Sequence, residues 1–160
     1  MNIILTGPKQ CGKSTVIKKF LQVYKGSVSG FISEFDDRAS DTRQLIIRNI
    51  SSDNKICAVK WKDGKANVNY DAFNEFAPKL IDVNSRLILI DELGKFEASC
   101  IKLQDAVEEA FSSSANVIAV LRLDAPGWIN ELKLREDTLV FNVNTDNRNL
   151  LVEKLIYFSR

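Results

Sequence analysis

Two glycines five residues apart, followed at once by a lysine and a serine, constrain this chain more than any other feature. Gly7 and Gly12 enclose four residues, and Lys13 and Ser14 follow directly. The apolar residues 2–6 precede this segment and predict a strand buried on both faces. After the segment, apolar residues recur at helical spacing at Val16, Ile17, Phe20, Leu21 and Tyr24. A strand, a glycine-rich turn and a helix in this order open a βαβ unit, which predicts an α/β protein.

The glycine-containing segment fits the pattern G-x-x-x-x-G-K-[ST] of a phosphate-binding loop. Glycines let the backbone bend around an anion, and the N–H groups of the loop and of the next helix point toward it. Lys13 supplies a cation for the β- and γ-phosphate oxygens, Ser14 a hydroxyl ligand for Mg²⁺, and Thr15 a contact to an α-phosphate oxygen. The alternative is a structural turn with an incidental lysine. We predict a nucleotide-binding set of Gly7, Pro8, Lys9, Gln10, Cys11, Gly12, Lys13, Ser14 and Thr15.

A second feature is the pair of acids that ends the most apolar run of the chain, Leu87–Ile90. Ligands of open parallel sheets bind beyond the carboxyl ends of the strands. Asp91 is therefore predicted to bind Mg²⁺ together with Ser14. Glu92 is predicted to orient and deprotonate an attacking water, because the chain has no histidine. A solvated loop acid is the alternative for Glu92. An acid at this point suggests hydrolysis, and it suggests a sheet in which another strand lies between the loop strand and the Asp91 strand.

The remaining chain alternates between strand and helix patterns and predicts a mostly parallel sheet flanked by helices. We expect one domain over residues 1–160, with an antiparallel β-hairpin inserted at about 43–68 and a polar loop at 35–42. Further strands are expected at 28–33, 87–90, 116–121 and 139–143. Further helices are expected from Lys13 to Gly26, from Asp71 to Ile81 with a kink or restart at Pro78, and at 98–111, 128–134 and 150–158.

Composition excludes several classes of protein. The chain has 22 Lys and Arg against 21 Asp and Glu, which argues against a protein that coats nucleic acid. Without histidine it has no Ser-His-Asp triad and no histidine metal ligand. Three cysteines without a CxxC pair suit free thiols in a reducing cytoplasm, so we expect a cytoplasmic protein. No stretch fits a signal peptide or a membrane span, and the sequence leaves a protein partner unassigned.

Lys13 is predicted to be catalytic together with Glu92, and phosphoryl transfer needs positive charge beyond Lys13. The candidates are Arg43, Arg122, Arg135 and Arg148, of which Arg122 ends a strand on the expected ligand side. Arg148 follows the last strand, where a loop could contact the base, and we add Arg148 to the predicted nucleotide-binding set. Asp146 or Asn147 is expected to cap the last helix.

Four blocks of the sequence resemble the small P-loop nucleoside-triphosphatases, the group that includes the cancer-related nucleoside-triphosphatase. They are ILTGPKQCGKST (Ile4–Thr15), GFISE (Gly30–Glu34), LIDELGKFE (Leu89–Glu97) and VFNVNTDNRN (Val140–Asn149). The resemblance implies a three-layer RecA-like fold and slow, Mg²⁺-dependent hydrolysis of ATP, GTP and other nucleoside triphosphates to the diphosphate. It gives Asp91 the metal role and Glu92 the catalytic role, and it supports Lys95 and Arg148 as residues near the site.

The chain also departs from the family pattern. Lys9 and Gln10 stand where the family usually has Pro-Gly, and Phe35 stands where it usually has a second acid. Two other functions remain open at this point. A small-molecule or nucleotide kinase would share the loop but is expected to carry an arginine-rich lid, whereas Leu121–Arg135 holds only two arginines. A nucleotide-dependent switch could use the hairpin as a partner surface.

Overall fold

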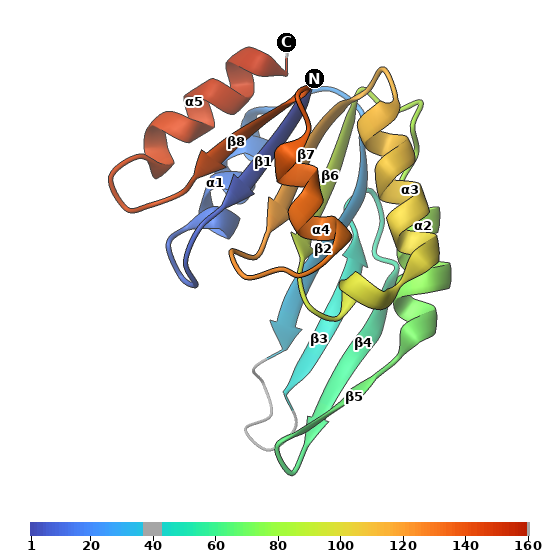
Figure 1. Ribbon diagram of the computed structural model, residues 1–160. Helices are drawn as coiled ribbons and strands as arrows, with labels where there is room; N and C mark the ends of the chain where they lie inside the picture. Colours follow the sequence, from blue (N-terminus) through green and yellow to red (C-terminus); the bar gives the residue numbers. More distant parts are fainter. Residues whose placement is uncertain (37–42, 160) are drawn as a thin grey trace.

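The computed structural model describes residues 1–36 and 43–159, and it builds them around one eight-stranded sheet in the order β5-β4-β3-β2-β6-β7-β1-β8 (Figure 1). The strands are β1 Asn2–Thr6, β2 Val28–Asp36, β3 Gln44–Asn49, β4 Lys55–Lys62, β5 Lys65–Val68, β6 Leu87–Leu93, β7 Asn116–Leu121 and β8 Thr138–Asn142. The α-helices are α1 Lys13–Val23, α2 Ala77–Lys79, α3 Ile101–Ser112, α4 Trp128–Glu131 and α5 Arg148–Phe158. A π-helical turn at Ala72–Phe76 and 3₁₀ turns at Glu97–Ser99 and Leu132–Leu134 complete the elements.

Five strands that neighbour one another in the order β2-β6-β7-β1-β8 run parallel. Strand β7 lies between β1, which leads into the glycine-rich loop, and β6, which carries the acidic pair. Because parallel strands end at a common edge, this order brings the loop and the acids to the same edge of the sheet. The predicted mostly parallel sheet and the predicted intervening strand are both confirmed.

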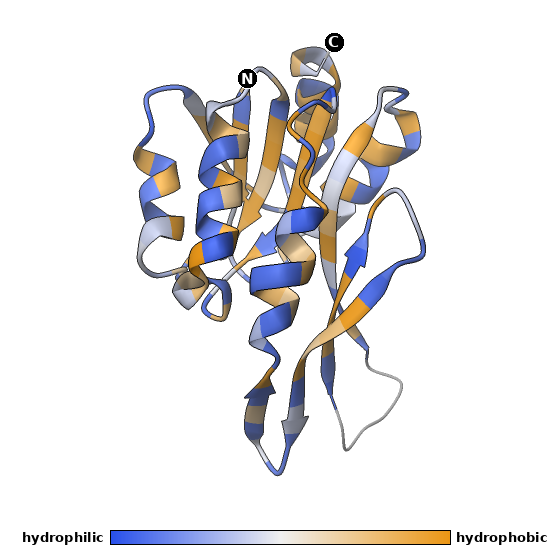
Figure 2. Cartoon of the chain, turned by 90° about the vertical axis from the view of Figure 1, so that its right-hand side faces the viewer, coloured by the Kyte–Doolittle hydropathy of each residue, from blue (hydrophilic) through white to orange (hydrophobic). Residues whose placement is uncertain are grey.

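Helices cover both faces of the parallel strands and give the molecule three layers (Figure 1). Helices α1 and α5 pack against each other on one face, and α2, α3 and α4 lie on the other. Successive side chains of β1 point to opposite faces, so Ile3 and Leu5 join one core cluster while Ile4 joins the other. Figure 2 shows the resulting hydrophobic strands behind helices that carry hydrophilic residues.

The inserted hairpin is confirmed and extends the sheet on its antiparallel side. Strand β3 pairs antiparallel with β2, β4 with β3, and β5 with β4. The predicted loop at 35–42 was wrong at its start, because β2 continues to Asp36 and Phe35 pairs with Leu45. The Phe35 ring lies 5.8 Å from the Trp61 ring, so aromatic packing across the strands extends β2. The remainder of that predicted loop lies outside the described residues.

Helix boundaries differ from the sequence prediction where local patterns are weak. Helix α1 ends at Val23 rather than at Gly26. The helix expected from Asp71 is a π-helical turn followed by α2, which restarts at Ala77 with Pro78 in its first turn, where proline is tolerated. The side chains of Asp71 and Asn147 stand at helix N-cap positions without making a capping hydrogen bond. Among the described residues, no helix has the length and apolar character needed to cross a membrane.

Candidate active site

The glycine-rich loop turns sharply between β1 and α1. Gly12 occupies the N-cap position of α1 with φ near 107°, a conformation that side-chain-bearing residues rarely adopt. A Cβ at Gly12 would also lie 3.1 Å from Cδ of Arg148, at the start of α5. Sequence and packing therefore both require glycine here, and the loop leaves the N-terminus of α1 open toward the cleft.

Lys13 is nearly buried beneath this loop. Its Nζ donates hydrogen bonds to the carbonyl oxygens of Gly7, at 2.9 Å, and Pro8, at 3.0 Å. Its side chain is therefore folded back onto the loop, and the ammonium group is held by neutral acceptors. Such a cation can exchange carbonyl oxygens for anionic phosphate oxygens, which bind it more strongly.

Asp91 and Glu92 lie at the carboxyl end of β6, next to a register irregularity in its pairing with β7. Asp91 is 4% exposed. Burial raises the pKa of Asp91 to about 7, with a further increase from Glu92 and an opposing effect of Lys13. Burial also raises the pKa of Glu92, while Lys13 and Arg122 lower it. The Lys13 ammonium thus acts on both carboxyl groups, so the loop and the acidic pair form one electrostatic unit.

No described residue donates a hydrogen bond to the Asp91 carboxylate, although this carboxylate is buried. A buried carboxylate without donors favours either protonation or a bound cation. Ser14 is exposed at the start of α1 and offers a hydroxyl oxygen. A carboxylate and a hydroxyl are hard oxygen donors of the kind that Mg²⁺ prefers.

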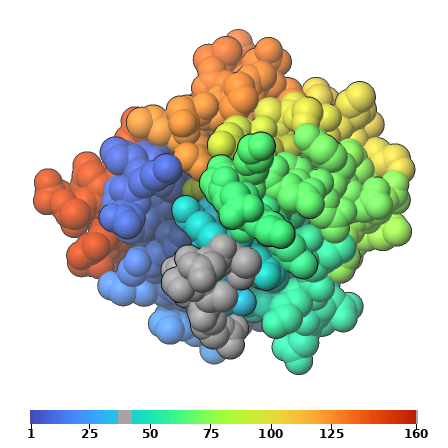
Figure 3. Space-filling view, turned by 90° about the horizontal axis from the view of Figure 1, so that it is seen from below, coloured from blue at the N-terminus to red at the C-terminus, as the bar shows by residue number. Residues whose placement is uncertain are grey.

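A cleft of about 510 Å³ opens at this edge of the sheet. In Figure 3, which shows this edge from below, the blue segment that contains the loop borders the hollowed part of the surface. Residues from the loop, β2, β6 and the segment after β7 line the cleft: Gly7, Lys9, Gln10, Gly12, Lys13, Ser14, Thr15, Phe35, Arg43, Glu92, Arg122, Leu123 and Asp124. Of the predicted site residues, Pro8, Cys11, Asp91 and Arg148 lie beside the cleft without lining it. Cys11 instead packs, half-buried, against the core cluster beneath α1.

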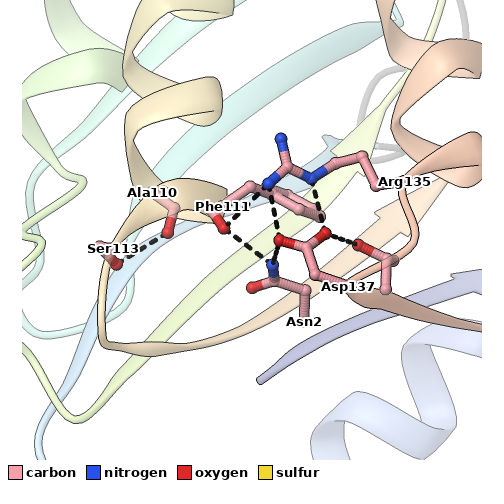
Figure 4. A network of polar contacts seen from close by, with 7 residues as sticks. Asn2, Ala110, Phe111, Ser113, Arg135 and Asp137 are labelled. Atoms are coloured by element: carbon pink, nitrogen blue, oxygen red, sulfur yellow. Dashed lines mark hydrogen bonds and ion pairs between the residues drawn. The ribbon is translucent and has the colours of Figure 1, made fainter.

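The four candidate arginines differ in their position relative to the cleft. Arg122 and Arg43 line the cleft, and Arg148 lies against Gly12. Arg135 lies at the opposite edge of the sheet, where it forms a bidentate pair with Asp137 at the start of β8 (Figure 4). Arg135 therefore cannot reach the cleft, and it is excluded as a cation for this site.

Three residues that line the cleft were missed by the sequence analysis: Phe35, Leu123 and Asp124. Arg43 lies over the Phe35 ring at 3.8 Å from its centroid. The sequence did hold a signal for Phe35, because this residue departs from the family pattern. Glu34, the preceding acid, pairs with Arg48 of β3 at 3.1 Å rather than entering the cleft. Lys95 lies over the Phe96 ring, outside the lining of the cleft.

A larger cavity, of about 700 Å³, lies at the opposite edge of the sheet. Its lining includes Tyr24, Lys25, Asn84 and Ser114, and it contains none of the loop or acidic residues. Volume alone would favour this cavity. The convergence of the loop, a buried lysine and two carboxyl groups instead identifies the smaller cleft as the candidate active site.

Comparisons with known proteins agree with this geometry. A profile of the family described as NTPase matches residues 2–156. The nucleoside-triphosphatase THEP1 of Thermotoga sp. (strain RQ2) is 28% identical over 98% of this chain and 94% of its own length. The cancer-related nucleoside-triphosphatase homolog of Mus musculus is 29% identical over 97% of this chain and 94% of its own.

Among solved structures, the crystal structure of THEP1 from Aquifex aeolicus superimposes with a TM-score of 0.83 and 23% identity, over 100% of this chain and 99% of that chain. This likeness confirms the predicted P-loop fold of the sheet and helices. The family profile spans nearly the whole chain, including the loop and both acids. The chain therefore belongs to the nucleoside-triphosphatase (NTPase) family.

Proposed function

We propose that this chain hydrolyses nucleoside 5′-triphosphates, ATP and GTP among them, to the diphosphate and phosphate in a Mg²⁺-dependent reaction. The observation that carries the proposal is the convergence of Lys13, Asp91 and Glu92 on one edge of the sheet, where Lys13 acts on both carboxyl groups. The names of the relatives, which are nucleoside-triphosphatases, support the same reaction.

The donor set supports Mg²⁺ as the cofactor. Ser14 and Asp91 would hold it, with phosphate oxygens and water completing the shell, because Mg²⁺ commonly takes only one or two protein ligands. The described residues contain no group of three or more acidic or thiol side chains that could cage a metal alone, which agrees with a metal that arrives with its nucleotide. When bound, Mg²⁺ supplies charge neutralisation to the phosphate oxygens.

The residues of the chain bind the phosphates and accept the proton from water. The loop amides and Lys13 bind the β- and γ-phosphates and place the γ-phosphorus toward β6. Glu92 accepts a proton from water as the water oxygen bonds to the γ-phosphorus and the bond to the β,γ-bridging oxygen breaks. The raised pKa of Glu92 makes it a stronger base than an exposed glutamate. The products are the nucleoside diphosphate and phosphate.

The test is phosphate release from ATP and GTP, with and without Mg²⁺, in the absence of any acceptor. We expect release that requires Mg²⁺ and needs no added acceptor. Release that begins only when an acceptor alcohol or phosphate is added would instead support a kinase. Tight Mg-nucleotide binding without release in either assay would support a switch module.

A further inference from the structure

The proposed reaction leaves one buried carboxyl group beside the site without a role. Glu97 follows the acidic strand and is only 3% exposed. Its Oε2 accepts a hydrogen bond from the Gly94 N–H at 2.9 Å. Burial raises the pKa of Glu97 to about 7, and Glu92 raises it further, while Arg122 and the Gly94 hydrogen bond lower it. A carboxyl group of this kind is costly to bury, so its retention calls for a structural or functional reason.

The reason for burying Glu97 lies in its partner Gly94, because the Arg122 side chain lies directly across Gly94. A Cβ at position 94 would lie 2.5 Å from Cδ of Arg122 and 3.6 Å from Oε2 of Glu97. The backbone of Gly94 is not left-handed, so this position needs glycine for space and not for conformation. The Arg122 N–H also donates to the Leu93 carbonyl oxygen at 3.0 Å, which fixes the end of β7 to the end of β6.

Arg122 is held from the solvent side as well. Its Nε lies 3.5 Å from Oδ1 of Asp124, a side chain that is 81% exposed. An exposed, single-contact pair of this length is weak, so Asp124 does not fix the direction of Arg122 by itself. On its buried side, the Arg122 side chain lies against Gly94 and Glu97. Arg122 also lines the cleft, together with Glu92 and Lys13.

We propose that Arg122 is the cation that meets the γ-phosphate during hydrolysis, and that Gly94 and Glu97 are positioning residues that hold it there. The inference rests on the proposed hydrolysis and adds to it the choice of arginine. Gly94 leaves the space for the arginine stem, and the Glu97 carboxylate holds the Gly94 amide in place beneath it. Preorganised charge of this kind contributes most at the transition state, so its loss should lower kcat more than it changes KM.

The decisive experiment is a double-mutant cycle in steady-state phosphate release. Arg122→Ala is expected to lower kcat on the order of 10²–10³-fold. Gly94→Ala, which leaves the arginine present but displaces its stem, is expected to lower kcat by roughly tenfold or more with KM nearly unchanged. In the Arg122→Ala background, Gly94→Ala should have no further effect, because it acts through Arg122. Gly26→Ala is the matched control, since Gly26 also has no left-handed φ and lines the cavity at the opposite edge.

Glu97 gives an independent second arm. Glu97→Ala removes the acceptor of the Gly94 N–H and should lower kcat roughly tenfold, again only while Arg122 is present. Glu97→Gln keeps an acceptor oxygen at the same place and should restore kcat to within about threefold of the wild type. Glu75→Gln, on an exposed glutamate that pairs with Lys102, is the matched control for a lost carboxylate.

The outcomes separate the two levels of the proposal. If the wild type releases no phosphate, the proposed function fails and the inference fails with it. If the wild type is active but the effects of Gly94→Ala and Arg122→Ala multiply, or if both variants change KM alone, the proposed function stands and the positioning role is overturned. Melting curves of every variant identify a loss of kcat that comes from unfolding.

Discussion

The two edges of the sheet carry similar side chains in opposite electrostatic states. At the amino edge, Asp137 accepts hydrogen bonds from Arg135, Asn2 and Thr138, and its pKa is lowered to about 2, chiefly by the hydrogen bond from Arg135 (Figure 4). At the carboxyl edge, Asp91 is buried without a hydrogen-bond donor from any part of the chain that the structure describes, and its pKa is raised to about 7.

This contrast teaches how the fold separates stability from function. The amino-edge charges have partners within the chain, so they stabilise the folded state. At the carboxyl edge, Asp91 has no hydrogen-bond donor among the described residues, and its burial costs stability unless a ligand supplies the missing interaction. Changes at the carboxyl edge should therefore alter activity first, whereas changes at the amino edge should alter stability alone.

The largest expected effect is that of Lys13→Ala. Removing the ammonium group should lower Mg-ATP affinity or turnover on the order of a hundredfold or more, because in the proposed complex this group binds the β- and γ-phosphate oxygens from within the loop. Calorimetric titration and phosphate release measure the two quantities. Lys19→Ala, on the exposed face of the same helix, is the control. Wild-type binding and turnover in Lys13→Ala would remove the carboxyl edge as the active site.

Glu92→Gln tests the catalytic carboxylate within that edge. The variant keeps the size of the side chain but loses its basicity, so it should bind Mg-ATP normally and hydrolyse it more slowly by roughly a hundredfold or more. Single-turnover phosphate release measures this step, with the exposed Glu108→Gln as control. Normal turnover in Glu92→Gln would show that another group accepts the proton.

Asp91→Asn should stabilise the free protein while abolishing turnover. Because the folded-state pKa of Asp91 is raised from 3.8 to about 7, its ionisation destabilises the fold progressively as the pH rises through that window. At pH 8 we expect a gain of at least about 1 kcal/mol, or roughly 2–4 °C in melting temperature for a chain of this size. The gain should shrink by pH 5. Asp105→Asn, at an exposed position of α3, should show neither change.

Asp137→Asn should give the opposite and smallest effect. Since the folded-state pKa is lowered to about 2, the stabilisation is present above the unfolded value near 3.8 and is lost as the pH falls toward 2. The side chain is half-exposed, so we expect a loss of about 1 kcal/mol or less at pH 6 and a smaller loss at pH 3. Urea unfolding measures both. Altered phosphate release in this variant would contradict the separation of the two edges.

Local pattern accounts for what the sequence predicted well. Residues 87–90 and 117–121 are short, continuously apolar runs, and both formed buried parallel strands. Segments that depend on distant partners were predicted less well. Phe35 looked like part of a polar loop, yet pairing with Leu45 and packing against Trp61 make it part of β2. The two partners lie 10 and 26 residues further along the chain, beyond the reach of local pattern.

The candidate site divides in the same way. The loop from Gly7 to Thr15 and the acids Asp91 and Glu92 were predicted from spacing. Each follows the end of a buried strand, and a few neighbouring residues of the sequence are enough to mark such a strand end. The sequence favoured Arg122 because it ends a strand on the ligand side, but it kept Arg135 as a candidate, and only the structure places Arg135 at the opposite edge of the sheet.

By itself, the sequence determined a phosphate-binding turn, an acidic strand end and the alternating elements that carry them. The tertiary structure decided which cation shares the cleft, that Phe35 and Leu123 line it, and that Gly94 and Glu97 lie against Arg122. The contacts of Gly94 and Glu97 with Arg122 join the end of β6 to the end of β7. They depend on how neighbouring strands are set side by side, which only the packed sheet defines.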